Sequence, residues 1–516
     1  QKSNLSLTRR ALTYNVFGTH TTTDSLRNLF SHLGRGRGTA YKDEDRSLTQ
    51  PGFDLTYMHP VSPSLALSFS AGYSNRVEIR DFLNASWNLV TNAQTASQKN
   101  PIIVPRERRL LSATADYKLG AKHRLSARLQ YTDDKAFAQL PTFSFNYGTL
   151  ASSGPDFSQG TAAANGSVTQ NVQHYNQIRQ TIGGKIGYHF TGDTWRANVN
   201  LGLSRAQFNT RTLEDGIFRT LSAQLTGISI RADNVRGMHE QVPPTITART
   251  AAGALVDTSN VALYTLTTAT GGTIPLKSNQ QTLKLDLARD LRLVAPIAFK
   301  TGIAYDRAER NIRNTTWTWT INPPASAGGR IVGNHDLIDT AFSSSWKYKD
   351  GSKVQWMESQ KAFKLFREHP EYFQLNEAAA HTSAVNGSKL LEETISAAYA
   401  RADVKFIDNR LWLAGGVRFE RTADEGTGPL NDPNAIYQKN ADGSLIRGAN
   451  GRPVPLPGTA LQLAQLQYKE RGSSGKSHYS GFYPSLNSSY TILPDLLIRA
   501  AYARTIGRPD ITAIVP

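Results

Sequence analysis

The sequence predicts an all-β protein, a transmembrane antiparallel up-and-down β-barrel with long extracellular loops. Three observations lead to this fold class. Apolar and polar residues alternate with a period of two, short turns and long connections follow one another in strict order, and no apolar run reaches the roughly 18 residues of a membrane-spanning helix. A barrel strand shows lipid only alternate side chains, so a hydrophobic content of 39% suits this fold.

The alternation is clearest in residues 123–132, 181–190 and 195–204. In each segment one face is apolar, as expected for contact with lipid, and the other is polar or charged, as expected for the inside of a barrel. The side chains predicted to face the lumen from two of these segments are Arg124, Arg128, Arg196 and Asn198.

Short turns and long connections alternate along the whole chain. The short turns lie at 59–64, 119–122, 191–193, 292–296, 407–409 and 493–495, and they define six hairpins. Connections above about 15 residues are uncommon in compact soluble domains, whereas outer-membrane barrels combine short periplasmic turns with long external loops. The long connections lie at roughly 21–48, 78–105, 136–175, 210–279, 312–387 and 424–478.

One further alternating run at about 9–20 and two runs in each hairpin give thirteen predicted spanning strands. An odd, open set of strands cannot sit in lipid, because both edges would expose unpaired backbone N–H and C=O groups. We therefore expect the complete barrel to have more strands than the 516 residues supply.

Charge and cysteine content narrow the function classes. The formal net charge is +17, from 58 Lys and Arg against 41 Asp and Glu, and there is no cysteine. The basic residues are spread over alternating strands and loops, which does not fit a nucleic-acid module. We expect them to line the lumen and to face anionic lipopolysaccharide. The lack of cysteine excludes disulfides and thiolate metal sites.

Several segments resemble parts of the TonB-dependent receptors of Gram-negative outer membranes. The opening KSNLSL resembles the segment that leads from the plug of these receptors into the first barrel strand, and residues 51–74 resemble an early barrel hairpin. AAYARTIGRPDITAIVP (500–516) is similar to a late strand and its GRP turn, and FKLFREHPEYFQLNE (363–377) resembles a helical loop insert of one subgroup.

The resemblance implies a 22-stranded barrel of which residues 1–516 are a partial barrel domain, with a helical loop insert at about 354–377. The plug, the TonB box and the C-terminal aromatic strand of the family have no counterpart in the sequence, so the plug is expected upstream. Polar lumen residues, among them Arg124, Arg128, Arg196 and Asn198, would contact that plug.

Neither a metal site nor an enzyme site is predicted. GRGRG (34–38) lacks the ending of a phosphate-binding loop, and HEQVP (239–243) lacks the second histidine of a zinc motif. The trio His335, Asp336 and Asp339 has no metal-site spacing, and no G-x-S-x-G motif occurs. We expect no catalytic residue, no metal and no cofactor.

The connection at 312–387 holds four of the seven tryptophans, Trp317, Trp319, Trp346 and Trp356. External loops meet a ligand first, and aromatic faces suit sugars, aryl chelates and apolar rings, so these four are the candidate ligand-binding residues. The alternative is that a loop of this length needs a small core of its own and packs these rings inward.

The predicted function is energised import of a large, scarce nutrient across the Gram-negative outer membrane. The resemblance implies that TonB relays the energy and that the substrate is a ferric chelate, a glycan or cobalamin, hence a small-molecule or oligosaccharide ligand. Three alternatives stay open. They are a passive porin-like channel, an adhesin or autotransporter-like barrel, and a soluble array of β-sandwiches.

Overall fold

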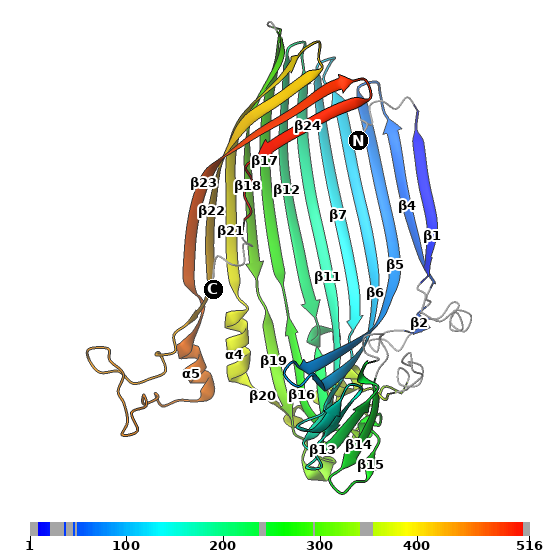
Figure 1. Ribbon diagram of the computed structural model, residues 1–516, viewed down its shortest axis with the longest axis vertical. Helices are drawn as coiled ribbons and strands as arrows, with labels where there is room; N and C mark the ends of the chain where they lie inside the picture. The colour runs from blue at the N-terminus through cyan, green and yellow to red at the C-terminus, as the bar shows by residue number, and fades with distance from the viewer. Residues whose placement is uncertain are drawn as a thin grey trace.

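The computed structural model describes residues 9–20, 36–37, 45–46, 49–236, 244–292, 295–340 and 354–508. Its main body is one antiparallel sheet of long strands that lie side by side (Figure 1). The thirteen long strands are β1 (Ala11–His20), β4 (Thr49–Pro60), β5 (Leu65–Asn88), β6 (Ala93–Lys118), β7 (His123–Gln139), β11 (Gly166–Thr191), β12 (Trp195–Arg211), β17 (Leu276–Arg292), β18 (Pro296–Ile312), β21 (Lys389–Phe406), β22 (Leu411–Asn431), β23 (Tyr468–Leu493) and β24 (Leu496–Ala503).

Each of these strands pairs with the next in chain order, from β1–β4 through β7–β11 and β12–β17 to β23–β24. This is the up-and-down order that the sequence predicts, with the predicted number of strands. In the described part of the chain β1 pairs only with β4 and β24 only with β23, so the sheet has two free edges. The fold class is confirmed.

Short turns close the six hairpins at one end of the sheet, and the long connections gather at the other end (Figure 1). The turn after β21 needs three residues in the left-handed region, with φ of 52° at Ile407, 49° at Asp408 and 67° at Asn409. Asn and Asp accept this conformation more readily than other non-glycine residues do. The turn after β6 uses Gly120, with φ of 89°.

One predicted long connection is wrong. Residues 78–105 are not a loop, because β5 and β6 continue as a hydrogen-bonded hairpin up to the pair Asn88–Ala93. Beyond the membrane no lipid requires an apolar face, so the period-two pattern fades while the backbone ladder continues. One face of this extension is buried instead against the loops, at Val77, Ser97 and Ile103.

The described residues of the remaining long connections contain further strands and helices at the outer end of the sheet (Figure 1). These strands are β2 (Gly36–Arg37), β3 (Asp45–Arg46), β8 (Thr142–Asn146), β9 (Leu150–Gly154), β10 (Phe157–Gly160), β13 (Thr220–Asp233), β14 (Thr245–Thr250), β15 (Leu255–Val256), β16 (Thr265–Thr273), β19 (Thr315–Ile321) and β20 (Phe373–Leu375). The helices are α3 (Ser359–Glu368), α4 (Glu377–Asn386) and α5 (Ala460–Gln467), with 3-10 turns at Leu213–Asp215, Val261–Leu263, Ala325–Ala327, Val332–Asn334 and Pro370–Tyr372.

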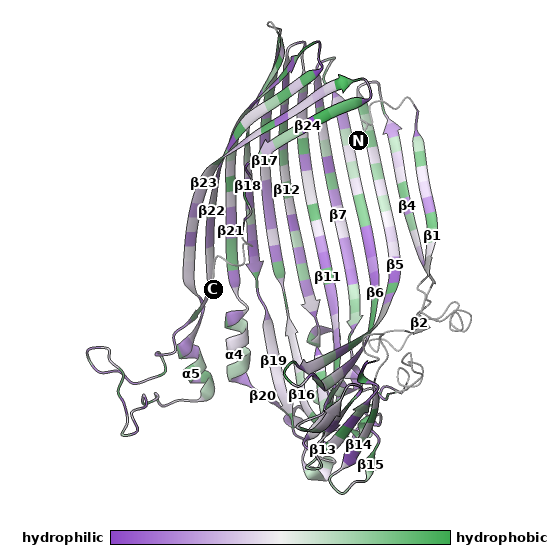
Figure 2. Cartoon of the chain, in the orientation of Figure 1, coloured by the Kyte–Doolittle hydropathy of each residue, from purple (hydrophilic) through white to green (hydrophobic). Residues whose placement is uncertain are grey.

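The two faces of the sheet differ in polarity, and the alternation shows as bands along each strand (Figure 2). One face, here the apolar face, carries large side chains that no second protein layer covers in the described residues. Leu129 is 56% exposed, Ile186 is 57% exposed and Phe482 is 61% exposed. A β-sandwich would bury this face, so the structure favours a lipid-facing barrel wall over that alternative.

Aromatic side chains sit on the apolar face near the short turns, at Tyr117, Trp195, Phe406 and Tyr490. Tyr and Trp suit the boundary between acyl chains and headgroups, because each combines an apolar ring with a polar tip. Trp412 does not belong to this set. It pairs with Lys405, so it lies on the opposite face from its neighbour Leu411, which pairs with Phe406.

Candidate functional site

Two regions of the molecule can meet a ligand. The first is the polar face, the side of the long strands that carries Arg124, Arg128, Arg196 and Asn198. The second is the loop core, the buried cluster formed by the long connections at the outer end of the sheet. In a barrel the polar face lines the lumen and the loops surround its mouth.

Ion pairs between strands hold the polar face together. Arg124 on β7 donates from Nη2 to Asp116 Oδ1 on β6 at 2.7 Å, and the Asp116 side chain is only 5% exposed. Arg196 on β12 donates from Nη2 to Asp290 Oδ1 on β17 at 2.6 Å. These predicted lumen residues therefore face the same side as their partners and fix the strand register.

Asn198 joins the same network through a histidine. His189 Nδ1 on β11 lies 2.7 Å from Asn198 Oδ1 on β12, and the two residues are direct cross-strand partners. A neutral or charged imidazole that carries a proton on Nδ1 donates to this amide oxygen. Asn198 thus lies in the sheet with its side-chain carbonyl oxygen already hydrogen-bonded to His189.

Arg128 differs from the other three predicted residues. Its Nη2 donates to Gln130 Oε1 on the same strand at 3.1 Å, and it has no ion pair in the described part of the chain. The residue directly opposite on β11 is Lys185, which also lacks an ion pair among the described residues. Two like charges therefore face each other, an arrangement that destabilises a sheet unless an anion lies nearby.

A shallow recess of ≈ 330 Å³ lies beside this pair. It exists because Gly183 and Gly202 replace larger side chains on the polar face, and hydroxyl groups form the rest of its floor. Its lining on this face includes Arg128, Lys185, Thr132, Thr181, Ser204 and Thr282.

A cluster of arginines near the outer end of the polar face is not evident from the sequence. Arg108 Nη2 lies 3.0 Å from Asp134 Oδ2, and Arg106 Nε and Arg179 Nη1 each lie 4.0 Å from Asp134 Oδ1. Arg76 is directly opposite Arg106. These residues come from four strands, and only the hydrogen-bonding register brings them together, so no local motif could have indicated them.

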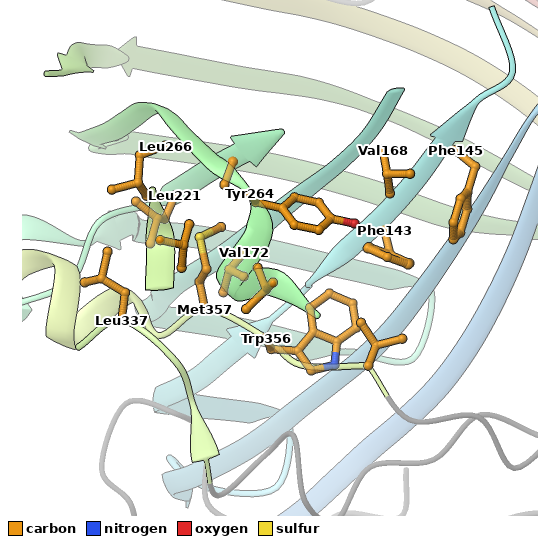
Figure 3. Packing of buried hydrophobic residues seen from close by; sticks show 14 of the residues in the cluster. Phe143, Phe145, Val168, Val172, Leu221, Tyr264, Leu266, Leu337, Trp356 and Met357 are labelled. Carbon is orange, nitrogen blue, oxygen red and sulfur yellow. The ribbon is translucent and has the colours of Figure 1, made fainter. Parts of the chain in front are cut away.

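The loop core is a continuous set of buried apolar side chains from strands and loops that lie far apart in sequence (Figure 3). Phe143 packs edge-on against Phe145 and against Trp356, with ring centroids 4.7 Å and 6.1 Å apart. Tyr264 lies 6.4 Å from Phe143. The connections at 136–175, 210–279 and 312–387 therefore share one packed body in the described residues.

The candidate tryptophans lie at different depths in this body. Trp356 is 1% exposed and Trp319 is 7% exposed, whereas Trp317 is half-buried at its edge. Trp346 lies outside the described residues. In this arrangement Trp356 and Trp319 form the core, as in the alternative that the loop packs its aromatics inward, and ligand contact at Trp317 stays a prediction.

The helix α3 is part of the same packing. Phe363 and Phe366 each place their ring centroid 5.6 Å from that of Phe218, and Phe366 lies 5.6 Å from Trp319. Ser359 Oγ at the start of the helix donates to the Phe218 carbonyl at 2.8 Å. The aromatic face of the predicted insert therefore points into the core.

Burial also changes the acidity of the core tyrosines. The Tyr147 hydroxyl is fully buried and donates to Gln94 Oε1 at 3.1 Å. Burial raises the pKa of Tyr147 to about 12, because the phenolate would lose its hydration. Burial likewise raises the pKa of Tyr264.

The described residues contain no group of three or more His, Asp or Glu side chains placed to hold a metal ion. His335 Nε2 lies 2.8 Å from the Gly329 carbonyl, and Asp336 accepts a 2.9 Å hydrogen bond from Lys361 Nζ. No helix in the described part of the chain is long and apolar enough to cross a membrane.

The sheet has an exposed apolar face, a charged opposite face and a packed external body at one end. This combination defines a membrane β-barrel of the outer-membrane type. The family model "TonB dependent receptor-like, beta-barrel" matches residues 222–516. The chain therefore belongs to the TonB-dependent receptor β-barrel family, whose members are transport receptors of the outer membrane and not enzymes.

Two solved structures are similar to the chain. A mutant of the ferric enterobactin receptor PfeA from Pseudomonas aeruginosa, in complex with enterobactin, shares 7% identity at a TM-score of 0.15; the match covers 95% of this chain and 74% of that one. The copper transporter OprC shares 6% identity at a TM-score of 0.12, with 88% and 71% covered. No curated protein sequence matches the chain.

Proposed function

We propose that the chain forms the wall and outer vestibule of a receptor that imports a large, scarce nutrient across the outer membrane with energy relayed by TonB. The observation that carries this proposal is the pairing of an uncovered apolar face with a charged face on the same strands, below a packed external body. A ferric chelate, a glycan and cobalamin are the substrate classes that the family suggests.

The packed loop core supports a receptor rather than an open pore. A large hydrophobic cluster holds the connections at 136–175, 210–279 and 312–387 together at the outer end of the sheet, so they offer a shaped surface to a ligand. In this proposal TonB acts through a plug, which the polar face would contact through Arg124, Arg128, Arg196 and Asn198. The outer membrane lipids would contact the apolar face, and lipopolysaccharide would meet the basic loops.

The test uses the full-length receptor in cells. Uptake of labelled ferric citrate, cobalamin and a maltodextrin is compared between cells with and without the receptor, each with and without a protonophore. We expect receptor-dependent uptake of at least one substrate class that the protonophore abolishes. Receptor-dependent uptake that continues after the membrane potential has collapsed would support the passive channel instead.

A further inference from the structure

We propose that the polar face carries a binding track for multiply charged anions. Its outer station consists of Arg76, Arg106, Arg108 and Arg179, and its inner station consists of Arg128 and Lys185. This inference deepens the proposed transport role and rests on the polar face lining a lumen. It adds the chemical class of the ligand.

The outer station has an excess of positive charge. Arg108 and Arg179 both pair with Asp134 across neighbouring strands, and Arg76 pairs with Arg106 one row further out. The neighbouring carboxylates are Asp134 and Glu78, which lies two residues from Arg76 on the same face. Within the described part of the chain, the single carboxylate of Asp134 lies within 4.0 Å of three of the four guanidinium groups.

Three of the four arginine side chains are well exposed, whereas Arg106 is 23% exposed. The side chains of Arg108 and Arg179 are 58% and 44% exposed, and Arg76 is exposed as well. The Asp134 side chain beneath them is 7% exposed. Arg108 already donates to Asp134 Oδ2 from Nε and Nη2, and Arg179 donates from Nη2 to Gln177 Oε1. The N–H groups left to bind carboxylate or phosphate oxygens are those of Arg108 Nη1 and of Arg179 Nε and Nη1.

The station lies where the strands leave the lipid. At this height on β6 and β7, the opposite face of the sheet carries charged side chains in place of apolar ones. They are the ion pair of Arg109 with Glu107 and that of Lys135 with Asp133. Asp134 is eleven residues from the start of β7, which corresponds to about 37 Å along the strand. An anion that passes the loop core would therefore meet these arginines at the mouth of the lumen.

The inner station lies six residues further along β11, about 20 Å from Arg179. The polar-face residues between the two stations on β7 and β11 are uncharged, and they are Gln130, Thr132, Thr181 and Gly183. The recess beside Arg128 and Lys185 gives an anion room at the wall. Because Arg128 is also a proposed plug contact, an anion would reach this second station only after the plug has shifted.

The arginines of the two stations differ from other arginines of the polar face in their ion pairs. Arg124, Arg196, Arg401 and Arg418 each have a carboxylate partner within 2.8 Å. Arg124 and Arg401 each face a lysine, Lys118 and Lys300, but their carboxylate partners balance that charge. Arg76 faces Arg106 and Arg128 faces Lys185, and neither Arg76 nor Arg128 has an ion pair among the described residues. Like charges placed directly opposite one another cost stability, and a bound anion would offset that cost.

The experiment measures binding of citrate, inorganic phosphate and neutral maltotriose to the full-length receptor in detergent. The parent protein should bind citrate more tightly than phosphate, with an affinity that falls steeply with salt, and should not bind maltotriose at the same sites. The variant R76Q/R108Q/R179Q should bind citrate at least tenfold more weakly, and R128Q/K185Q at least threefold more weakly.

The matched control is Arg109→Gln, which removes a charge from the neighbouring position of β6 on the opposite face and should leave citrate binding unchanged. Heat-modifiable migration on gels confirms that each variant is folded. If the triple variant binds citrate with the parental affinity, the outer station does not bind the anion. If R128Q/K185Q does so, the inner station does not bind it.

A second result would also overturn the inference. If the triple variant keeps the parental citrate affinity while a polypeptide segment in the lumen becomes sensitive to protease, the arginines bind an acidic polypeptide and not a small anion. The transport proposal has a separate readout. Uptake that resists the protonophore contradicts energised import, whereas the difference in citrate affinity among the variants does not depend on the energy source.

Discussion

Tyr399 on β21 reaches across β18 and donates a 2.5 Å hydrogen bond from its hydroxyl to Asp286 Oδ1 on β17. The residue between them in the same row is Gly302, which pairs with Tyr399 on one side and with Asp286 on the other. A methyl group at Gly302 would lie 2.7 Å from Tyr399 Cε1. The missing side chain therefore lets the tyrosine lie flat over β18 and tie three strands together.

The substitution Gly302→Ala should break this link, because the new methyl group occupies the space of the tyrosine ring. We expect a loss of about 1–3 kcal/mol in the free energy of unfolding, the usual cost of overpacking. Urea-induced unfolding from lipid vesicles measures it. Gly184→Ala is the matched control, since its nearest neighbour would be 3.8 Å away. Equal stability of the two variants would contradict the proposed role of Gly302.

Arg124 and Arg128 lie on one face of β7 and should respond differently to alanine. Arg124→Ala leaves the buried Asp116 carboxylate without its cation, which should cost about 1–3 kcal/mol of unfolding free energy. Arg128→Ala removes a charge that repels Lys185 and should be neutral or slightly stabilising. A larger loss from Arg128→Ala than from Arg124→Ala would refute this account of the polar face.

The assignment of the apolar face to lipid predicts a face-dependent cost of charge. Leu129→Arg places a guanidinium among acyl chains near the middle of β7 and should destabilise the folded barrel by roughly 2–4 kcal/mol. Thr132→Arg places the same group on the polar face and should be tolerated. Both are measured by folding into vesicles of defined thickness, and equal tolerance would argue against lipid contact.

The loop core should loosen at alkaline pH. The pKa of Tyr147 is raised to about 12 by burial, above its unfolded value of about 10. Its stabilisation is complete below pH 10 and is lost as the pH rises to 12, by roughly 2–3 kcal/mol. Protease sensitivity of the loops should therefore increase over that window, and less so in Tyr147→Phe. Tyr437→Phe, outside the core, is the control and should behave like the parent.

Alanine substitutions separate ligand contact from packing among the tryptophans. Trp319→Ala removes a side chain that packs against Phe218 and Phe366, so it should cost about 3–5 kcal/mol in the loop core. Trp317→Ala should leave the core nearly intact and weaken uptake if this half-buried ring meets the ligand. Unchanged uptake kinetics of Trp317→Ala would eliminate the aromatic ligand site.

The spanning strands could be predicted because lipid on one side and an enclosed interior on the other impose a strict period of two. The sequence alone predicts that Leu129 lies on the apolar face and Arg128 on the polar face. The outer hairpin of residues 78–105 could not be predicted in the same way, because both of its faces meet protein or water and the backbone ladder leaves no periodic signature.

The alternation predicts which face of the sheet Arg124, Arg196 and Asn198 share, whereas their partners Asp116, Asp290 and His189 depend on the register between strands. Contact of these residues with a plug stays a prediction. The arginine station around Asp134 depended on register alone. The burial of Trp356 required the three-dimensional meeting of segments separated by about two hundred positions, such as Phe143 and Trp356.

The extended hairpin of β5 and β6 joins the wall to the external body without a hinge. Its ladder runs unbroken from Leu65–Tyr117 beside the periplasmic turns to Asn88–Ala93 beneath the loops, apart from one irregularity at Ser86 and Trp87. A continuous hydrogen-bonded ladder therefore connects the packed external body to this part of the wall, and it restricts rigid-body movement of the one relative to the other.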